Sequence, residues 1–249
     1  MRRVPPSRTV SLTRMLATRR FAAAVLSALC VVTAASCSSG QGPGPAETSL
    51  SPAQRLAAAK TKVDAASSVH LALTGSGMPD GASGIVSADG WGTHPPAFKG
   101  TFKVTLKGIQ ADAEITSVGG EVYAKLPFVP GTNKIDPKTF GLPDPATLFS
   151  PDQGLTTLLT KTQNPTVGKQ VRQGADVLTT VSGTLPGAAV VDLFQIGDRN
   201  GTYQVSYGLT DAQELRTVTI TGPFFGAGTS STYTLALDKY GQPVTITKP

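Results

Sequence analysis

Strict alternation of apolar and polar side chains runs through the segment TFKVTLK, residues 101–107. Phe102, Val104 and Leu106 fall on one face, and threonine and lysine side chains fall on the other. Because successive side chains of a β-strand point to opposite faces, the segment predicts a strand with one buried and one solvated face. Such strands are typical of an antiparallel sheet that packs on a core with one face only.

Similar short segments precede and follow this strand. Turn residues such as glycine and proline separate them, and their regular spacing predicts an antiparallel meander of about ten strands. The predicted strands cover residues 68–74, 85–88, 101–107, 111–117, 121–126, 167–172, 177–185, 203–207, 215–221, 231–237 and 244–247.

A helix is predicted before the first strand. It begins in the segment SPAQ, residues 51–54, which places serine at the N-cap, proline at the first helical position and glutamine where it completes a capping box. We expect this helix to end near residue 66, with Leu56, Ala59 and Val63 on its buried stripe.

Two shorter helices are predicted in the second half of the chain. One should open at residues 151–153 and lie across the sheet as a lid, with Leu155, Leu158 and Leu159 on its apolar face. The other covers residues 186–194. One sheet with few helices indicates a single α+β domain.

The first 36 residues are typical of a signal peptide. They hold six arginines and no acidic residue, and the apolar run over residues 21–35 is shorter than the roughly 20 residues that span a bilayer as a helix. Ala34, Ala35 and Ser36 stand directly before Cys37, and this segment resembles a bacterial lipobox, in which the cysteine becomes the lipidated first residue. Because Ala34 stands where leucine is usual, ordinary secretion that leaves a free thiol is the alternative.

The predicted signal peptide and the segment that follows it place the protein at the cell envelope. Residues 38–50 are rich in glycine, proline and serine and are expected to form a flexible tether, so the folded domain should occupy residues 51–249. Arg19 and Arg20 are similar to a twin-arginine export signal, but Phe21 follows the pair directly, which favours the general secretory route. We expect an exported protein, lipid-anchored on the outer (periplasmic) face of the cell membrane.

The net charge of +6 comes entirely from the predicted signal peptide. Six of the 22 lysine and arginine residues lie there, so the rest of the chain holds 16 basic and 16 acidic residues. A neutral chain offers no basic patch for phosphates, and nucleic acid is therefore not an expected partner. Cys30 leaves with the signal peptide, so Cys37 has no partner for an intramolecular disulfide.

Motifs of known catalytic sites do not occur in the sequence, which lacks a G-x-S-x-G elbow, a Walker loop, a paired-cysteine zinc site and H-E-x-x-H. His70 is expected to pack between helix and strand, and His94 to lie in a loop. Asp112 and Glu114 share a strand face that we expect to be solvated. The chain is therefore expected to be no enzyme and to need no metal or cofactor.

Several segments together resemble one family of lipoproteins. They are the tether and the first helix, the segment GGEVYAKL at residues 119–126, the segment from Asp144 to Leu155 and the ending YGQPVTI at residues 240–246. Their order and spacing resemble the mycobacterial LppX/LprA/LprF/LprG lipoproteins over nearly the whole chain. Tyr240 stands where several members have tryptophan, a departure that concerns local packing more than the fold.

The resemblance implies a curved antiparallel half-barrel sheet, similar to the LolA/LolB carriers, with helices packed on its concave face around an apolar cavity. It also implies acyl chains of lipids or glycolipids as ligands and a membrane transporter as a further partner. The candidate cavity-lining residues are Phe102, Val104, Leu106, Ile115, Val122, Leu126, Leu155, Leu158 and Leu159. The same pattern also describes a filled core, so the sequence leaves open whether this core is hollow.

The resulting hypothesis is a cell-envelope lipoprotein that binds lipids or glycolipids by their acyl chains and carries them between membranes. Burying one methylene contributes about 0.8 kcal/mol, so an acyl chain of about 16 carbons costs on the order of 12 kcal/mol to expose to water. A cavity would remove this cost without ATP or a catalytic residue. The alternative is a tethered adaptor or scaffold for an envelope transporter or sensor, and a hydrolase is disfavoured by the missing nucleophile motif.

Overall fold

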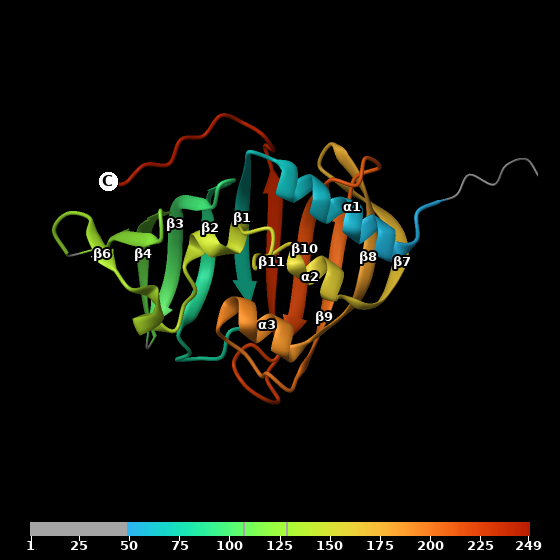
Figure 1. The fold of residues 1–249 in the computed structure, drawn as a ribbon. Helices are drawn as coiled ribbons and strands as arrows, with labels where there is room; N and C mark the ends of the chain where they lie inside the picture. The colour runs from blue at the N-terminus through green and yellow to red at the C-terminus, as the bar shows by residue number, and fades with distance from the viewer. Residues whose placement is uncertain (1–48, 107, 128) are drawn as a thin grey trace, which may run out of the picture. The chain divides into compact units, whose positions relative to one another are not determined.

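Eleven β-strands form one antiparallel sheet in the computed structural model, which describes residues 49–106, 108–127 and 129–249 (Figure 1). The strands are β1 (Ser68–Ser76), β2 (Gly84–Thr93), β3 (Ala97–Leu106), β4 (Ile109–Val118), β5 (Glu121–Lys125), β6 (Asn133–Ile135), β7 (Gln163–Gln173), β8 (Asp176–Pro186), β9 (Thr202–Leu209), β10 (Leu215–Gly222) and β11 (Ser231–Asp238). The helices are α1 (Pro52–Ala65), α2 (Thr157–Lys161), α3 (Gly187–Phe194) and the 3-10 helices η1 (Pro137–Phe140) and η2 (Pro145–Phe149). Among the described residues, no helix has the length and apolarity needed to cross a membrane.

The predicted signal peptide, Cys37 and most of the predicted tether lie outside the described residues, as does Lys107 of the segment TFKVTLK.

The strands follow the order β6-β5-β4-β3-β2-β1-β11-β10-β9-β8-β7 across the sheet. Strands that are consecutive in the chain pair with each other, except β6 and β7, which form the two edges of the sheet; only the pairing of β1 with β11 joins distant parts of the sequence. Because β6 and β7 do not pair, the sheet curves without closing into a barrel, and the α-helices cover one of its faces (Figure 1). The predicted fold class, an α+β half-barrel with helices on its concave face, is confirmed.

Helix α1 begins where the capping box predicts. The side chain of Ser51 accepts a hydrogen bond from Gln54 N (3.3 Å), and the side chain of Gln54 accepts one from Ser51 N (2.9 Å). Leu56, Ala59 and Val63 form the buried face of the helix, as predicted. This face brings α1 into contact with β10 and with α2.

The predicted strand at residues 244–247 is wrong. The chain leaves β11 through a turn in which Gly241 N donates a hydrogen bond to Ser68 O (2.9 Å), and the tail after it forms no regular element. Both sides of β11 are already paired, with β1 and with β10, so the tail finds no free strand edge beside β11. Figure 1 shows the tail running toward the end of the sheet that holds β6.

The segment between β5 and β7 also differs from the prediction. It contains β6 and two 3-10 helices that were not predicted, and α2 begins at Thr157 rather than near residue 151. Leu155 N donates to Leu148 O (2.9 Å), so the chain folds back onto η2 instead of forming a first helical turn. A Cβ atom at Gly154 would lie 2.3 Å from Leu148 O, so this close approach requires glycine.

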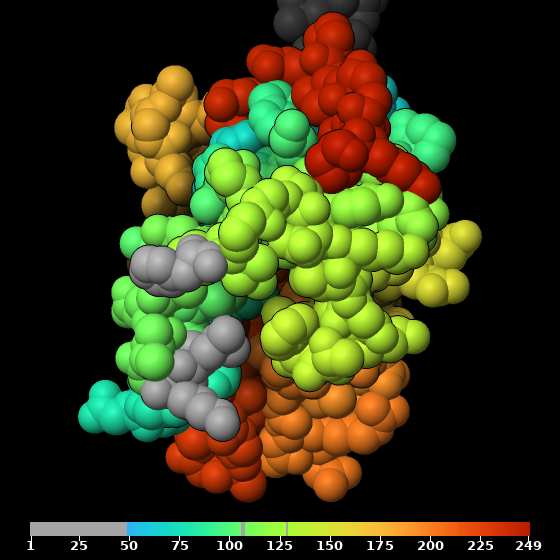
Figure 2. All heavy atoms as spheres, turned by 90° about the vertical axis from the view of Figure 1, so that its left-hand side faces the viewer, coloured from blue at the N-terminus to red at the C-terminus, as the bar shows by residue number. Residues whose placement is uncertain are grey.

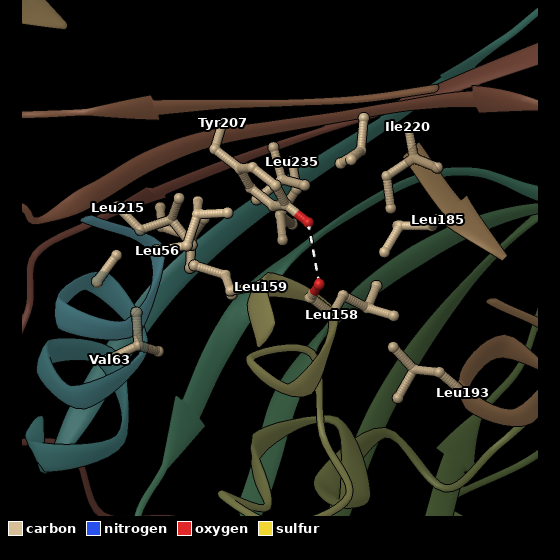
Figure 3. Packing of buried hydrophobic residues seen from close by; sticks show 14 of the residues in the cluster. Leu56, Val63, Leu158, Leu159, Leu185, Leu193, Tyr207, Leu215, Ile220 and Leu235 are labelled. Atoms are coloured by element: carbon tan, nitrogen blue, oxygen red, sulfur yellow. Dashed lines mark hydrogen bonds between the residues drawn. The ribbon is translucent and has the colours of Figure 1, made fainter. Parts of the chain in front are cut away.

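A fully buried part of the core lies between the α-helices and strands β8–β10. The side chains of Val181, Leu185, Tyr203, Tyr207 and Leu209 have no exposed surface. Figure 3 shows Tyr207 pointing from the sheet toward α2, where its hydroxyl lies 3.3 Å from the backbone oxygen of Leu158. The helices and the second half of the sheet therefore share one packed interior.

Candidate functional site

An apolar cavity of about 320 Å³ lies between the concave face of the sheet and the layer of helices. This volume is within the range of about 300–1,000 Å³ that is typical of small-molecule sites. Its wall includes side chains from β1–β6, from β9–β11 and from all five helices. Among the described residues, no aspartate, glutamate, lysine or arginine belongs to this wall. The cavity is therefore suited to an uncharged, apolar group.

The structure places eight of the nine predicted lining residues in this wall. They are Phe102, Val104, Ile115, Val122, Leu126, Leu155, Leu158 and Leu159. The side chain of the ninth, Leu106, lies outside the described part of the structure. Val122, Leu158 and Leu159 are buried, whereas the other five are only partly buried, and these five present apolar surface to the cavity.

Small residues beside a large one explain why the first half of the sheet, strands β1–β6, leaves space between its side chains. Phe102 on β3 is paired with Ala88 on β2 and with Ala113 on β4. All three line the cavity. Protein interiors normally fill such gaps with neighbouring side chains, but two methyl groups cannot fill the space on either side of the Phe102 ring. The alternation predicts which residues face inward, and the size of those residues decides how much volume remains.

Sequence reasoning missed the part of the wall that comes from the last strands. Val218 and Ile220 on β10, and Leu235 and Leu237 on β11, line the cavity. Val218 and Ile220 alternate with threonines in the same way as residues 101–107, whereas Ala236 stands between Leu235 and Leu237. The periodic signal was present, but nothing in it indicates that β11 pairs with β1 and so encloses the same space.

Tyrosine and histidine side chains bring polar groups into the wall. The hydroxyl of Tyr207 lies 2.8 Å from Thr162 Oγ1, while the buried hydroxyl of Tyr233 has no hydrogen-bond partner among the described residues. His94 lies in the turn after β2, as predicted, and its Nδ1 is 2.6 Å from Ala66 O. Burial raises the pKa of both tyrosines, so the two hydroxyls stay protonated and uncharged at neutral pH.

Hydrogen bonds fasten the helical layer over the cavity. The amine of Lys60 on α1 donates to Pro151 O (2.5 Å) and to Thr156 Oγ1 (3.1 Å), which holds the segment before α2 against α1. At the other end of the layer, the hydroxyl of Ser117 on β4 donates to the carboxylate of Asp144, the N-cap of η2. The segment that contains η2 and α2 is thus hydrogen-bonded both to α1 and to the sheet.

One entrance lies beside η1. Figure 2 shows a narrow hollow between the strands around β3 and β4, drawn in green, and the segment around η1, drawn in yellow-green. Phe140 of η1 lines the cavity and is also 53% exposed. An apolar side chain that reaches from the cavity wall to the surface marks a path along which a ligand can enter.

The other residues considered from the sequence lie away from the cavity. His70 on β1 has one ring nitrogen 2.7 Å from Asp238 and the other 3.3 Å from Asp89. Asp112 and Glu114 lie on an exposed face of β4, where each faces a lysine. Within the described residues, no group of three or more histidine, cysteine, aspartate or glutamate side chains could hold a metal ion.

Comparison with known proteins gives a consistent assignment. A model of the LppX_LprAFG lipoprotein family matches residues 51–246. Proteins named lipoarabinomannan carrier protein LprG, from Mycobacterium tuberculosis and Mycobacterium bovis, are 28% identical over 233 residues, which cover 93% of this chain and 95% of theirs.

Two solved structures share the fold. LprF from Mycobacterium bovis aligns with a TM-score of 0.66 at 20% identity and covers 80% of this chain and 96% of its own. LppX from Mycobacterium tuberculosis aligns with a TM-score of 0.56 at 20% identity and covers 79% of this chain and 98% of its own.

Proposed function

The chain belongs to the LppX_LprAFG lipoprotein family, and from this premise we propose that it binds lipids or glycolipids by their acyl chains and carries them between membranes of the cell envelope. The observation that carries the proposal is the cavity, whose described wall is apolar and free of charged side chains. The name of the LprG relatives, lipoarabinomannan carrier protein, supports a glycolipid as ligand.

The energetic case rests on the hydrophobic effect. An acyl chain of about 16 carbons costs on the order of 12 kcal/mol to expose to water, which prevents a lipid with two or three chains from crossing an aqueous gap alone. Part-buried side chains such as Phe102, Val104 and Ile115 offer apolar surface that a chain can cover. Transfer then needs no covalent step, and we propose no catalytic residue.

The remaining parts of the chain fit a tethered carrier. We propose that residues 1–36 are a signal peptide, that Cys37 is lipidated, and that residues 38–50 tether the domain of residues 51–249 to the outer face of the cell membrane. Family membership supports an exported lipoprotein. A membrane transporter is proposed as partner on the resemblance alone.

Native mass spectrometry of the exported protein tests the proposal. A Cys37→Ala form, which removes the acylation site, would be purified from a lipid-rich host, weighed intact, and extracted with solvent for lipid analysis. We expect extra mass that extracts as multi-chain lipid. Val104→Trp should reduce the bound lipid at least severalfold while the protein stays folded, because the partly buried Val104 side chain points into open volume.

A matched control separates blocking of the cavity from a general effect of tryptophan. Val171 lies on the edge strand β7, is 54% exposed and is not part of the cavity wall, so Val171→Trp should keep the lipid. A protein that carries no lipid and takes up none when it is offered would overturn the carrier proposal and favour the adaptor. Equal loss in both variants would show that the cavity does not hold the lipid.

A further inference from the structure

A second, polar hollow lies beside the apolar cavity. This polar groove has a volume of about 800 Å³ and is lined by residues of η1, η2, α2, α3 and the loops next to them. The segment of residues 141–143 lines both the polar groove and the cavity. One short stretch of chain therefore separates an apolar space from a polar one.

The two spaces lie on opposite sides of the covering layer. Leu148 lines the cavity and its neighbour Thr147 lines the polar groove. At the end of α3, Phe194 lines the cavity and its neighbour Gln195 lines the polar groove. A molecule with an apolar part and a polar part can place one on each side of residues 141–143, next to the entrance beside η1.

Four polar side chains of the groove are free to contact a ligand. Lys138, Asp152, Gln153 and Lys161 are exposed, and their side chains form no hydrogen bond or ion pair with another described residue. Other polar residues of the groove are engaged within the protein, as Asp192 is with Arg199 at 2.7 Å. The free set contains two amines that donate, a carboxylate that accepts and an amide that does both.

We propose that the polar groove binds the sugar headgroup of a glycolipid whose acyl chains lie in the cavity, an inference that rests on the proposed carrier function. Each sugar hydroxyl both donates and accepts hydrogen bonds, which matches the mixed set of free side chains. A phosphate only accepts, and the groove wall offers it no net positive charge, because Asp192 is paired with Arg199 and the carboxylates of Asp144 and Asp152 balance the amines of Lys138 and Lys161. The charge of the groove therefore favours a neutral, polyhydroxylated headgroup.

Two lipids with identical chains test the headgroup site. Dipalmitoylglycerol and its diglucosyl derivative would each compete with a fluorescent acyl-chain probe for the Cys37→Ala protein. We expect the glycolipid to bind on the order of tenfold more tightly, because its headgroup adds hydrogen bonds to the groove that dipalmitoylglycerol cannot make. The double variant Asp152→Ala/Gln153→Ala should lose most of this advantage and bind dipalmitoylglycerol as before.

Matched variants and a third lipid sharpen the test. Asp80→Ala/Gln170→Ala removes the same two residue types at exposed positions outside both walls and should change neither affinity. Thermal melting should show that both double variants remain folded. Dipalmitoyl phosphatidylglycerol should gain nothing from Asp152 and Gln153.

The outcomes distinguish failure of the headgroup site from failure of the carrier function. Binding of neither lipid would overturn the carrier function and the headgroup site together. Binding of both lipids with equal affinity, or an equal loss for both in Asp152→Ala/Gln153→Ala, would overturn the headgroup site and leave the carrier function standing. If dipalmitoyl phosphatidylglycerol binds more tightly than dipalmitoylglycerol, and Lys138→Ala/Lys161→Ala removes this difference, the groove binds a phosphate, contrary to the proposal.

Discussion

The two halves of the sheet, strands β1–β6 and strands β7–β11, share the same alternation of inward-facing and outward-facing residues but differ in the size of the inward-facing ones. One row of paired, inward-facing residues crosses the sheet from β8 to β4 and consists of Val181, Tyr207, Val218, Leu235, Leu73, Ala88, Phe102 and Ala113. In the second half of the chain every member of the row is bulky, and Val181 and Tyr207 are fully buried. In the first half, two alanines flank one phenylalanine, and the cavity extends over these small residues, although Tyr207, Val218 and Leu235 also belong to its wall.

The helices that cover the two halves of the sheet also differ. The α-helices contact β7–β10, whereas the short 3-10 helix η2 contacts β2, β3 and β4. Bulky residues under well-packed helices give a solid core, and small residues under a thin cover give a hollow one. A pattern of inward-facing residues therefore identifies the interior of the fold, while residue size and the cover determine whether that interior is filled.

Truncating one leucine in each half should give the largest difference in stability. Leu185 on β8 is fully buried and does not line the cavity, so Leu185→Ala should lower the free energy of unfolding by about 3–4 kcal/mol through lost burial and a new void. Leu73 on β1 is partly buried and lines the cavity, so Leu73→Ala should cost about 1–2 kcal/mol. Urea unfolding of lipid-free protein measures both values, and equal losses would contradict the contrast between a filled and a hollow half.

Removing a single buried hydroxyl from Tyr207 or from Tyr233, both in the second half of the chain, should give a smaller contrast. Tyr207→Phe leaves the backbone oxygen of Leu158 and the hydroxyl of Thr162 without this partner and should cost about 1–2 kcal/mol. Tyr233→Phe removes a hydroxyl that has no partner among the described residues and should change stability by less than about 0.5 kcal/mol. The same unfolding experiment compares them; a loss in Tyr233→Phe as large as that in Tyr207→Phe would indicate that the Tyr233 hydroxyl is bonded in the folded state.

The smallest expected effect concerns the outer edge of the hollow half, where ion pairs link the tail to the sheet. Hydrogen bonds from Lys134, Lys248 and Tyr123 to Glu121 lower the pKa of its carboxyl to about 2. Because the pKa in the folded state is below the unfolded value of about 4.3, this contribution to stability is present above pH ~4.3 and is lost as the pH falls through about 2.

A carboxyl NMR titration checks this value directly. Lys248→Ala should move the pKa of Glu121 part of the way back to its ordinary range and leave global stability nearly unchanged, since exposed ion pairs contribute little. A pKa of Glu121 that is the same with and without the Lys248 amine would mean that the tail is not held at Glu121 in solution.

Local signals in the sequence predicted most of the elements. The capping box at Ser51 and the alternation in segments such as residues 101–107 depend on neighbouring residues only, and the structure contains both elements. The predicted strand at residues 244–247 failed for the opposite reason, because a strand needs a free edge, and β11 had none to offer. The 3-10 helices between β5 and β7 follow no apolar period and left no comparable signal.

The sequence by itself determined the α+β class, the inward-facing residues and the family resemblance, because periodicity, capping and turn chemistry act over a few residues. Only the tertiary structure decided that β1 pairs with β11, that Ala88 and Ala113 flank Phe102, and that residues 141–143 separate an apolar space from a polar one. These features depend on which distant segments meet. Empty volume in particular belongs to no single residue, since it is the space left when the side chains of several strands and helices fail to reach one another.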